Sequence, residues 1–460
     1  MTSTLRANVL SYREVLANNI ANIAPAIAVF FVFGTIVSGT GVGAPLIVLV
    51  AGVAMLFHAN TTAEFNKVTP SSGFYATFIS RSLGQRVGRW LSMAYVFGYL
   101  GSYVAVTYQI GVWTNTALQS TFGINLPWWV AALVFQALAV YLAWRGVRLS
   151  VRVTVSLFLF ELLMILVAAV AILATHAPAI SLAGFVPSHV QGGFGRGLGF
   201  GFPLAIFLFV GTSASSPLAE EAHEARTTLP RSIMTAILFA IVLFVFLAWV
   251  QGIGFNNNTH QLVKSAFPFI TAASRSLPIL QPLLYLAGLT SAMAVLLSVV
   301  NGSARVFYNV AQQRLLPRTM TRIHDHWATP SISIGLSAIV AAAITIGLSL
   351  FVGAGNGFAY SATLGTDIYV VIYIAANVAL PIYFWTRSRS AFSWIRHGLV
   401  PVVGIALLAY PFWISVSPHQ PPPYDLFGLF LLIVLVGTAI YGATRRGYLD
   451  NNAETVAERK

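Results

Sequence analysis

Residues 199–217 read GFGFPLAIFLFVGTSASSP, and this stretch decides the fold. An apolar run typical of a membrane span passes into residues 211–217, which are small, polar or helix-breaking. Lipid offers no hydrogen-bond partner to a broken backbone. A helix that stops halfway across a membrane therefore survives only inside protein or beside a water-filled cavity. The stretch predicts a discontinuous membrane helix, and such helices form the binding sites of secondary transporters.

The composition supports a membrane protein. The 460 residues are 57% hydrophobic and only 8% charged, whereas roughly 25% charged residues are usual in soluble domains. Apolar runs long enough to cross a bilayer as helices recur along the chain. We therefore expect an all-α polytopic membrane protein. Cysteine is absent from the sequence, which excludes disulfides and thiol chemistry.

The apolar runs predict twelve transmembrane helices. Their expected bounds are 18–39, 44–60, 88–117, 126–144, 151–175, 197–217, 233–255, 280–305, 331–352, 358–385, 399–417 and 426–444. We divide the chain into a cytoplasmic N-terminal segment (1–17), a ten-helix transport core (18–385), accessory helices 11 and 12 (386–444) and a cytoplasmic tail (445–460).

The distribution of basic residues predicts the orientation. With the N-terminus inside, only Arg196, Lys264 and Arg275 of the 25 basic residues fall outside the cytoplasmic segments and helix ends. Cytoplasmic loops of membrane proteins carry such an excess of Lys and Arg. We therefore expect both termini on the cytoplasmic side of the inner (cytoplasmic) membrane. The net charge of +13 then results from basic residues in the cytoplasmic segments, and no nucleic-acid partner is expected.

A second break is predicted in the first span, at residues 22–26 (NIAPA). Pro25 on its own also fits a simple kink. The two breaks lie five spans apart, and an odd number of spans inverts the second copy of a repeat relative to the first. The pattern predicts inverted repeats over about 18–175 and 197–385, in which the two broken helices meet at the midplane.

Several motifs resemble one transporter family. Residues 207–233 (FLFVGTSASSPLAEEAHEARTTLPRSI) resemble the sixth-helix signature of the amino acid–polyamine–organocation superfamily. Residues 301–330 resemble the family's eighth helix and following loop, residues 63–84 its loop between helices two and three, and residues 421–429 a segment of bacterial members. The resemblance implies a LeuT-like fold of five plus five inverted helices with helices 1 and 6 broken, and two accessory helices.

The resemblance also implies a substrate site at the two breaks. A substrate carboxylate would lie against backbone N–H groups after the first break, and an ammonium would face carbonyls of the second. The implied residues are Ala24, Pro25, Ala26, Ile27, Ala28, Phe207, Leu208, Val210, Gly211 and Ser213. The chain departs from the family twice, because Pro25-Ala26-Ile27 replaces a Gly-x-Gly and Thr212-Ser213 stands where many members carry an acid.

Glu161 is the sharpest candidate for ion coupling. It lies nine residues beyond Arg152, about 13 Å into the membrane at 1.5 Å per residue. An ionisable group at that depth is costly and marks a functional site by default. Next to exposed carbonyls of helix 1 and polar atoms of helix 8, with Ser298 as the expected neighbour, it would be protonated or hold a cation. A neutral, hydrogen-bonded structural glutamate is the alternative.

Two residues are candidate gates. Phe207 matches the family's aromatic residue over the substrate, with ordinary packing as the alternative. Asp367 lies deep in the tenth expected span and could form an outer gate or pair with a basic substrate, or only hydrate a vestibule.

The sequence predicts a permease that moves amino acids by alternating access, coupled to protons or sodium. A polyamine or amine permease or exchanger of the same fold is the alternative. An enzyme is not expected, because HExxH, GxSxG and cysteine are missing. A channel would need a continuous polar pore. We expect no cofactor, since no phosphate-binding loop occurs, and no metal site at His324-Asp325-His326.

Overall fold

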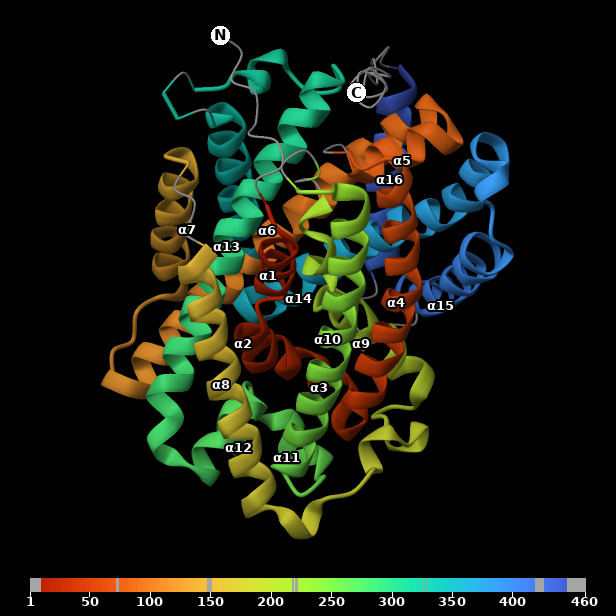
Figure 1. Cartoon of the computed structure of the whole chain (residues 1–460). Coiled ribbons are helices and arrows are strands. Elements are labelled where there is room, and N and C mark those ends of the chain that lie inside the picture. The colour runs from red at the N-terminus through yellow and green to blue at the C-terminus, as the bar shows by residue number, and fades with distance from the viewer. Residues whose placement is uncertain are drawn as a thin grey trace.

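The computed structural model describes residues 10–71, 74–146, 151–216, 219, 222–324, 326–327, 329–417 and 426–444. Over these ranges the regular elements are helices, and the β contact seen is one isolated parallel bridge between Leu10 and Ala222. Figure 1 shows the helices packed side by side, with most of them running between the two ends of the molecule. A helix satisfies its backbone hydrogen bonds internally, which lipid requires.

The helices of the first half are α1 (Tyr12–Ile23), α2 (Pro25–Ile27), α3 (Phe33–Thr40), α4 (Ala44–Val68), α5 (Phe74–Leu83), α6 (Gln85–Phe122), α7 (Trp128–Trp144) and α8 (Val151–Thr175). Those of the second half are α9 (Phe194–Phe207), α10 (Ala225–Ile253), α11 (Thr259–Lys264), α12 (Pro268–Ser276), α13 (Gln281–Gln312), α14 (Ser331–Arg387), α15 (Val400–Ser415) and α16 (Phe427–Thr444).

Shorter turns connect them. Two are π-helical, η1 (Ala28–Val32) and η11 (Trp394–Leu399). The 3₁₀ turns include η6 (Val210–Ser213), and also Gly41–Gly43, Ala177–Ala179, Ala183–Phe185, Pro187–His189, Pro278–Leu280, Arg318–Thr321 and Arg389–Ala391.

Eight helical stretches in the described part of the chain are long and apolar enough to cross a membrane. One of them, α14, has 57 residues and would measure about 86 Å if straight, far more than the roughly 30 Å of bilayer hydrocarbon. It bends at Gly353 (φ 74°, ψ 166°), so the loop expected over 353–357 is reduced to this bend. The protein is a polytopic helical membrane protein. The count of twelve spans and the inverted repeat stay predictions.

Helices α6 and α14 pack closely against each other. A Cβ atom on Gly101 of α6 would lie 2.7 Å from the Cα atom of Gly365 in α14, so only glycine permits this approach. Such contact between small residues is typical of membrane helices, which gain little from apolar burial and depend on close packing. Helix α14 also contacts α9, so this closely packed pair adjoins the sixth expected span.

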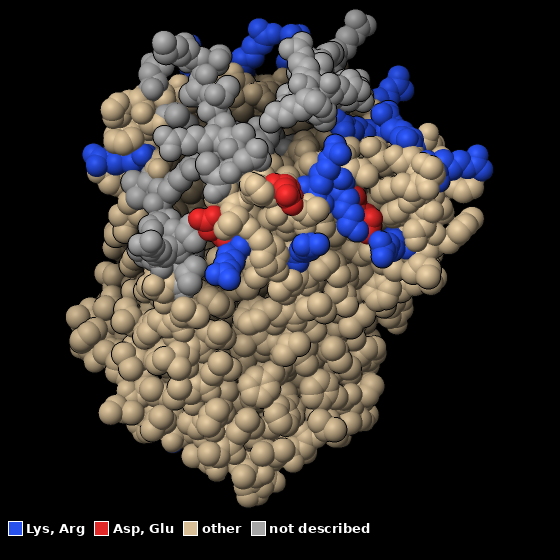
Figure 2. Space-filling view, viewed as in Figure 1, with Lys and Arg blue, Asp and Glu red and all other residues tan. Residues whose placement is uncertain are grey.

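Charged residues gather at one end of the molecule. Figure 1 shows the end of α16, the last described helix, at the top of the view. In Figure 2 the Lys, Arg, Asp and Glu residues of this face lie near that end, and the face below is free of charged residues. An uncharged band of this kind is the part of the surface that lipid can cover.

Candidate functional site

The first expected span is interrupted at Ala24. Helix α1 ends at Ile23, Ala24 adopts the left-handed conformation (φ 48°, ψ 63°), and Pro25 opens α2. Proline has no N–H and cannot continue the hydrogen bonding of α1, but its φ suits the first residue of a helix. The chain continues through η1 into α3. Backbone groups at these helix ends are left without the usual helical partners.

The sixth expected span is interrupted after Phe207. Helix α9 ends there, Leu208 and Phe209 form a turn, and η6 follows. The Thr212 hydroxyl donates to the Phe209 carbonyl over 2.8 Å, which satisfies one freed acceptor. Pro217, expected to end the break, lies outside the described residues. Helix α10 begins at Ala225, so the helical path is interrupted over many residues.

The two breaks lie directly against each other. A Cβ atom added to Gly211 would lie 2.5 Å from the carbonyl carbon of Asn22 and 2.9 Å from the backbone nitrogen of Ile23. Both distances are below any that real Cβ atoms show, so the backbones meet only because residue 211 is glycine. The interruption of α1 and that of α9 therefore form one site rather than two separate irregularities.

Hydroxyl groups after Gly211 are held by neighbouring helices. Ser215 donates its backbone N–H to Asn19 Oδ1 (2.8 Å), and Asn18 Nδ2 donates to Ser215 Oγ (2.9 Å). From α4, Asn66 Nδ2 donates to Ser216 Oγ over 3.3 Å. These bonds replace helical hydrogen bonding in a stretch that lipid could not solvate.

Glu161 contacts the first break. Its side chain is 4% exposed on α8, and its carboxyl group interacts with the Ala26 backbone N–H and the Ser291 hydroxyl. Ser291 Oγ makes no hydrogen bond of good geometry to a described residue, so its contact with the carboxyl group is a loose one. A buried carboxyl needs such partners to offset its lost hydration. Glu161, the residue expected to couple ions, therefore contacts the backbone at the start of α2.

Ser298 has a different partner from the one expected. Its hydroxyl donates to Asn22 Oδ1, whereas Ser291 takes the contact with Glu161. The two serines are seven residues apart on α13, so they lie two turns apart on one helix face. Helix α13 therefore touches both sides of the first break. A role of Ser298 in ion coupling stays a prediction.

A series of aromatic ring contacts joins Phe207 at the end of α9 to Phe31 of η1, which follows the first break. The half-buried Phe207 packs edge-on against Phe358 of α14, with ring centroids 6.3 Å apart. Phe358 packs edge-on against Phe31 (4.9 Å), which contacts Phe267 at 5.5 Å. Edge-to-face pairs of this kind are favourable beyond the area they bury. The location of Phe207 fits the expected gate, which stays a prediction.

Asp367 faces an accessory helix. Its side chain is 1% exposed, and Ser415 of α15 donates to Asp367 Oδ2 over 3.2 Å. Its Oδ1 atom has no hydrogen-bond partner among the described residues. The carboxyl group lies between α14 and α15, and Phe358 of the same helix is the residue that contacts Phe207. The structure does not bring the two candidate gates together.

The other implied site residues share one place but differ in exposure. Ala24, Pro25, Ala26, Ile27, Ala28 and Leu208 are buried, and Phe207, Val210, Gly211 and Ser213 are partly exposed. The N–H of Ala28 is bonded to the Ala24 carbonyl (3.1 Å). Of the three donors implied for a carboxylate, Ala28 is therefore already used within the chain, and Ala26 faces Glu161.

Sequence reasoning placed Asn22 in the first break without assigning it a contact, and it missed Asn19 and Ser291. Asn22 and Asn19 lie on α1 just before the break, where an amide in an apolar span is costly unless it is bonded. Ser291 lies on the helix face of Ser298, so a helical projection would have found it. These three signals were available in the sequence, but the pairing of Ser291 with Glu161 required the fold.

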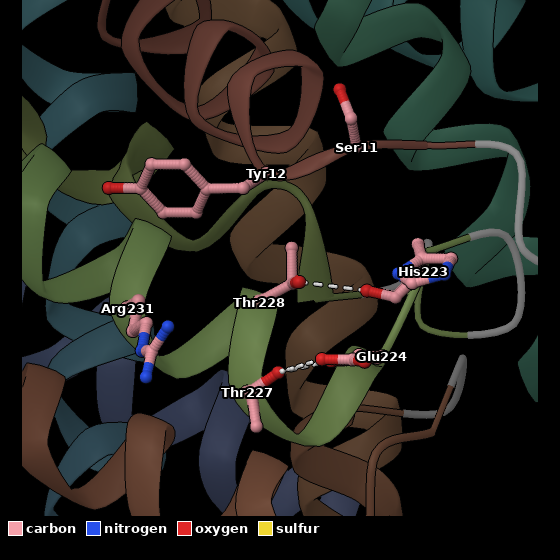
Figure 3. A pocket seen from close by; sticks show the side chains of 7 residues that line it. All are labelled: Ser11, Tyr12, His223, Glu224, Thr227, Thr228 and Arg231. Atoms are coloured by element: carbon pink, nitrogen blue, oxygen red, sulfur yellow. Dashed lines mark hydrogen bonds between the residues drawn. The ribbon is translucent and has the colours of Figure 1, made fainter.

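A pocket of about 440 Å³ is lined by residues at the start of α1 and around the start of α10. Figure 3 shows it between the start of α1 and the start of α10. Its hydroxyls are used internally, since Thr228 donates to the His223 carbonyl (2.8 Å) and Thr227 to the Glu224 carboxylate (3.3 Å). The remaining lining residues are Ser11, Tyr12 and Arg231.

The described residues hold no group of three or more His, Asp or Glu side chains that could bind a metal ion. Asp325, between His324 and His326, lies outside the described residues.

Comparison with known proteins places the chain among transporters. The Amino acid permease family model matches residues 14–440. "Branched-chain amino acid permease BcaP" of Bacillus subtilis (strain 168) is 25% identical over 332 residues, covering 66% of this chain and 67% of that protein. The "Methylthioribose transporter" of the same organism is 24% identical over 442 residues, covering 90% and 88%. "Branched-chain amino acid permease BcaP" of Lactococcus lactis subsp. cremoris (strain MG1363) is 23% identical over 428 residues, covering 88% and 89%. The matched segment includes both helix breaks, and the chain belongs to the amino acid permease family.

Proposed function

We propose that the protein is a secondary active transporter that carries amino acids across the cytoplasmic membrane by alternating access. The observation that carries the proposal is the meeting of two broken helices at Gly211 and Asn22. Membership of the permease family supports transport in general. Broken helices that meet inside a bundle supply free backbone donors and acceptors at membrane depth, where a polar substrate needs them.

The substrate's charged groups would bind the two breaks. The N-terminal end of α2 favours an anion, because its first N–H groups lack helical partners and lie at the positive end of the helix dipole. The carbonyls of Phe207 and Leu208 receive no hydrogen bond from the described residues. They are free to accept bonds from an ammonium group. A carboxylate near Ala26 and Ile27 and an ammonium near Leu208 would orient an α-amino acid.

The side chain of the substrate is apolar in this proposal. Ile27, Leu208 and Phe207 contribute apolar surface around the breaks, and Thr212-Ser213 stands where an acid could have paired with a basic side chain. A cationic side chain buried without a counter-charge would be strongly disfavoured. Two relatives are named branched-chain amino acid permeases. L-leucine is therefore the first substrate to test.

Glu161 would couple transport to protons. Its carboxyl contacts the Ala26 N–H, the same donor that the substrate carboxylate would use. Two carboxylates cannot both be ionised beside one donor without strong repulsion. Binding of substrate then requires a protonated Glu161, and release of the proton favours release of the substrate. Sodium in place of the proton would fit the same site, and Ser298 beside Asn22 would complete it.

The proposal includes the arrangement of the chain across the membrane. Twelve spans would place both termini in the cytoplasm, with inverted repeats over about 18–175 and 197–385 and two accessory helices over 386–444. The segment 1–17 and the tail 445–460 would lie in the cytoplasm. The gathering of charged residues in the upper part of the view in Figure 2 supports a single cytoplasmic face.

Uptake by proteoliposomes tests the proposal. We expect radiolabelled L-leucine to accumulate when a proton gradient is imposed and to exchange with internal leucine without one. Isoamylamine, which is leucine without its carboxylate, should compete poorly. Equal competition by isoamylamine, or uptake of polyamines instead of leucine, would favour the amine permease or exchanger. Absence of both uptake and exchange across a panel of amino acids would refute the proposal.

A further inference from the structure

We propose that the turn between α14 and α15 binds an anionic phospholipid, and that Arg389 contacts the headgroup of this lipid. The turn comprises residues 385–399, which include the end of α14, the 3₁₀ turn η10 (Arg389–Ala391) and the π-helical turn η11. The turn contains none of the residues of the two helix breaks. The inference therefore goes beyond the proposed transport function and does not depend on its substrate.

Large apolar side chains of this turn are exposed. The exposed fraction is 47% for Trp385, 74% for Trp394, 66% for Ile395 and 60% for Leu399. Trp385 lies in the last turn of α14, and Trp394 begins a helical stretch, Trp394–Ser415, that is long and apolar enough to cross a membrane. Tryptophan at the ends of membrane spans lies at the level of the lipid headgroups. The turn is therefore expected at the membrane surface, in contact with lipid.

Ring contacts join the two ends of the turn. Phe392 packs edge-on against Trp385, with centroids 5.5 Å apart, and against Trp394 at 5.3 Å. Trp385 and Trp394 also contact each other at 6.2 Å. The guanidinium group of Arg389 lies over the Trp385 ring, 4.6 Å from its centroid. This cation–π contact holds a positive charge on the exposed aromatic surface.

The turn carries positive charge without an acid of its own. Residues 385–399 contain Arg387, Arg389 and Arg396, and neither Asp nor Glu. Within the described part of the chain, Arg389 and Arg396 form no ion pair with a carboxylate. Basic residues near a membrane surface attract anionic lipids, because their charges add to one field. A headgroup phosphate is the anion that lipid supplies at this depth.

The backbone of the turn is held against α4. The Ser393 N–H donates to His397 Nδ1 over 2.9 Å, so the ring carries its proton on Nε2 and donates to Glu64 Oε2 at 3.2 Å. Asn60 Nδ2 donates to the Arg396 carbonyl over 2.9 Å. These bonds fix the turn before a ligand binds, which lowers the entropy cost of binding.

A phospholipid matches both parts of this surface. Its acyl chains would cover exposed side chains such as Trp394 and Leu399, and its phosphate would bind at Arg389. A soluble anion would use only the arginine and leave the apolar side chains uncovered. In a symmetric contact, a second copy of the chain would place the same positive turn against this one, and like charges repel.

The absence of native cysteine allows the lipid beside the turn to be measured directly. An NBD fluorophore is attached to Ser390→Cys, an exposed position next to Arg389. Its quenching by spin-labelled phosphatidylglycerol is compared with quenching by spin-labelled phosphatidylcholine in otherwise identical phosphatidylcholine bilayers. We expect half-maximal quenching at a mole fraction of phosphatidylglycerol about five- to tenfold lower than that of phosphatidylcholine.

Substitutions test the role of the charge. Arg389→Gln should lower the preference for phosphatidylglycerol by about fivefold, which corresponds to about 1 kcal/mol for one basic residue at a membrane surface. Arg389→Lys keeps the charge and should keep most of the preference. Arg318→Gln is the matched control, because it removes the same charge from an exposed position between α13 and α14. It should leave the preference unchanged.

Salt provides a test that needs no change at Arg389. Raising the ionic strength from about 0.1 M to about 1 M shortens the screening length from about 10 Å to about 3 Å. The preference for phosphatidylglycerol should then largely disappear. This measurement decides if Arg389→Gln does not fold.

Four results would overturn the inference. The first is equal quenching by both lipids, and the second is a preference that survives both Arg389→Gln and high salt. The third is loss of the preference on adding millimolar inorganic phosphate, which would indicate a site for soluble anions. The fourth is efficient cross-linking of Ser390→Cys between copies at low protein density, which would make the turn a contact between copies. None of these results involves transport, so each leaves the proposed function untouched.

Discussion

Gly211 packs its Cα against the carbonyl group of Asn22, although 189 residues separate the two in the chain. The contact brings the interruption of α9 onto the interruption of α1, and no side chain larger than hydrogen fits between them. Asn22 also receives a hydrogen bond from Ser298. Asn22 therefore joins three elements, since its backbone meets the sixth-span break and its side chain contacts α13.

The Gly211 contact predicts a sharp steric limit. Gly211→Ala should push the breaks apart and lower the free energy of unfolding by about 1–3 kcal/mol, a typical cost of overpacking. L-leucine uptake should fall with it. Gly335→Ala is the matched control, because no atom lies within 4 Å of a Cβ there and alanine suits the interior of α14. Thermal unfolding and uptake of both variants would be compared, and equal behaviour would contradict the steric argument.

Glu161→Gln should separate exchange from accumulation. Glutamine keeps the shape and hydrogen bonding of protonated Glu161 but cannot ionise, so leucine should still bind and exchange. Uptake driven by a proton gradient should fall to background, and its pH dependence should flatten. A variant that accumulates leucine at the wild-type rate and pH profile would make Glu161 a structural residue. Sodium dependence of the wild type would change the ion but keep the site.

Asp367→Asn tests the second candidate gate. The bond from Ser415 requires only an acceptor oxygen, which asparagine provides, so the free energy of unfolding should change by less than about 1 kcal/mol. If Asp367 pairs with a basic substrate, the variant should lose lysine transport and keep leucine transport. Unchanged preference between leucine and lysine would leave Asp367 as a packing residue between α14 and α15.

The orientation of the chain can be tested with reporters. Fusions at Arg6 and at Lys460 should both report a cytoplasmic location, because nearly all basic residues belong to segments on that side. A reporter inserted between α11 and α12 should report the opposite side. An external signal from either terminus would show that the number of spans is not twelve.

The sequence alone determined the class of the protein and, to within a few residues, the places where its helices break, since α9 ends at Phe207, just before the break expected at 211–217. Long apolar runs with few charges require helices in a bilayer. Pro25 and residues 211–216 interrupt a helix by local chemistry, through a missing N–H or through hydroxyls that compete for backbone bonds. The motifs consist of these same local features. The permease family could therefore be identified from the sequence before the fold was known.

Tertiary structure decided the contacts of the site. The contact of Glu161 with Ala26 and Ser291 instead of Ser298 depends on how each helix is rotated and how deep it sits, as does the bond from Ser415 to Asp367. An apolar helix in lipid shows little amphipathic pattern from which its rotation could be read. Its rotation is set by close packing with neighbours distant in sequence, as at Gly211 and Asn22.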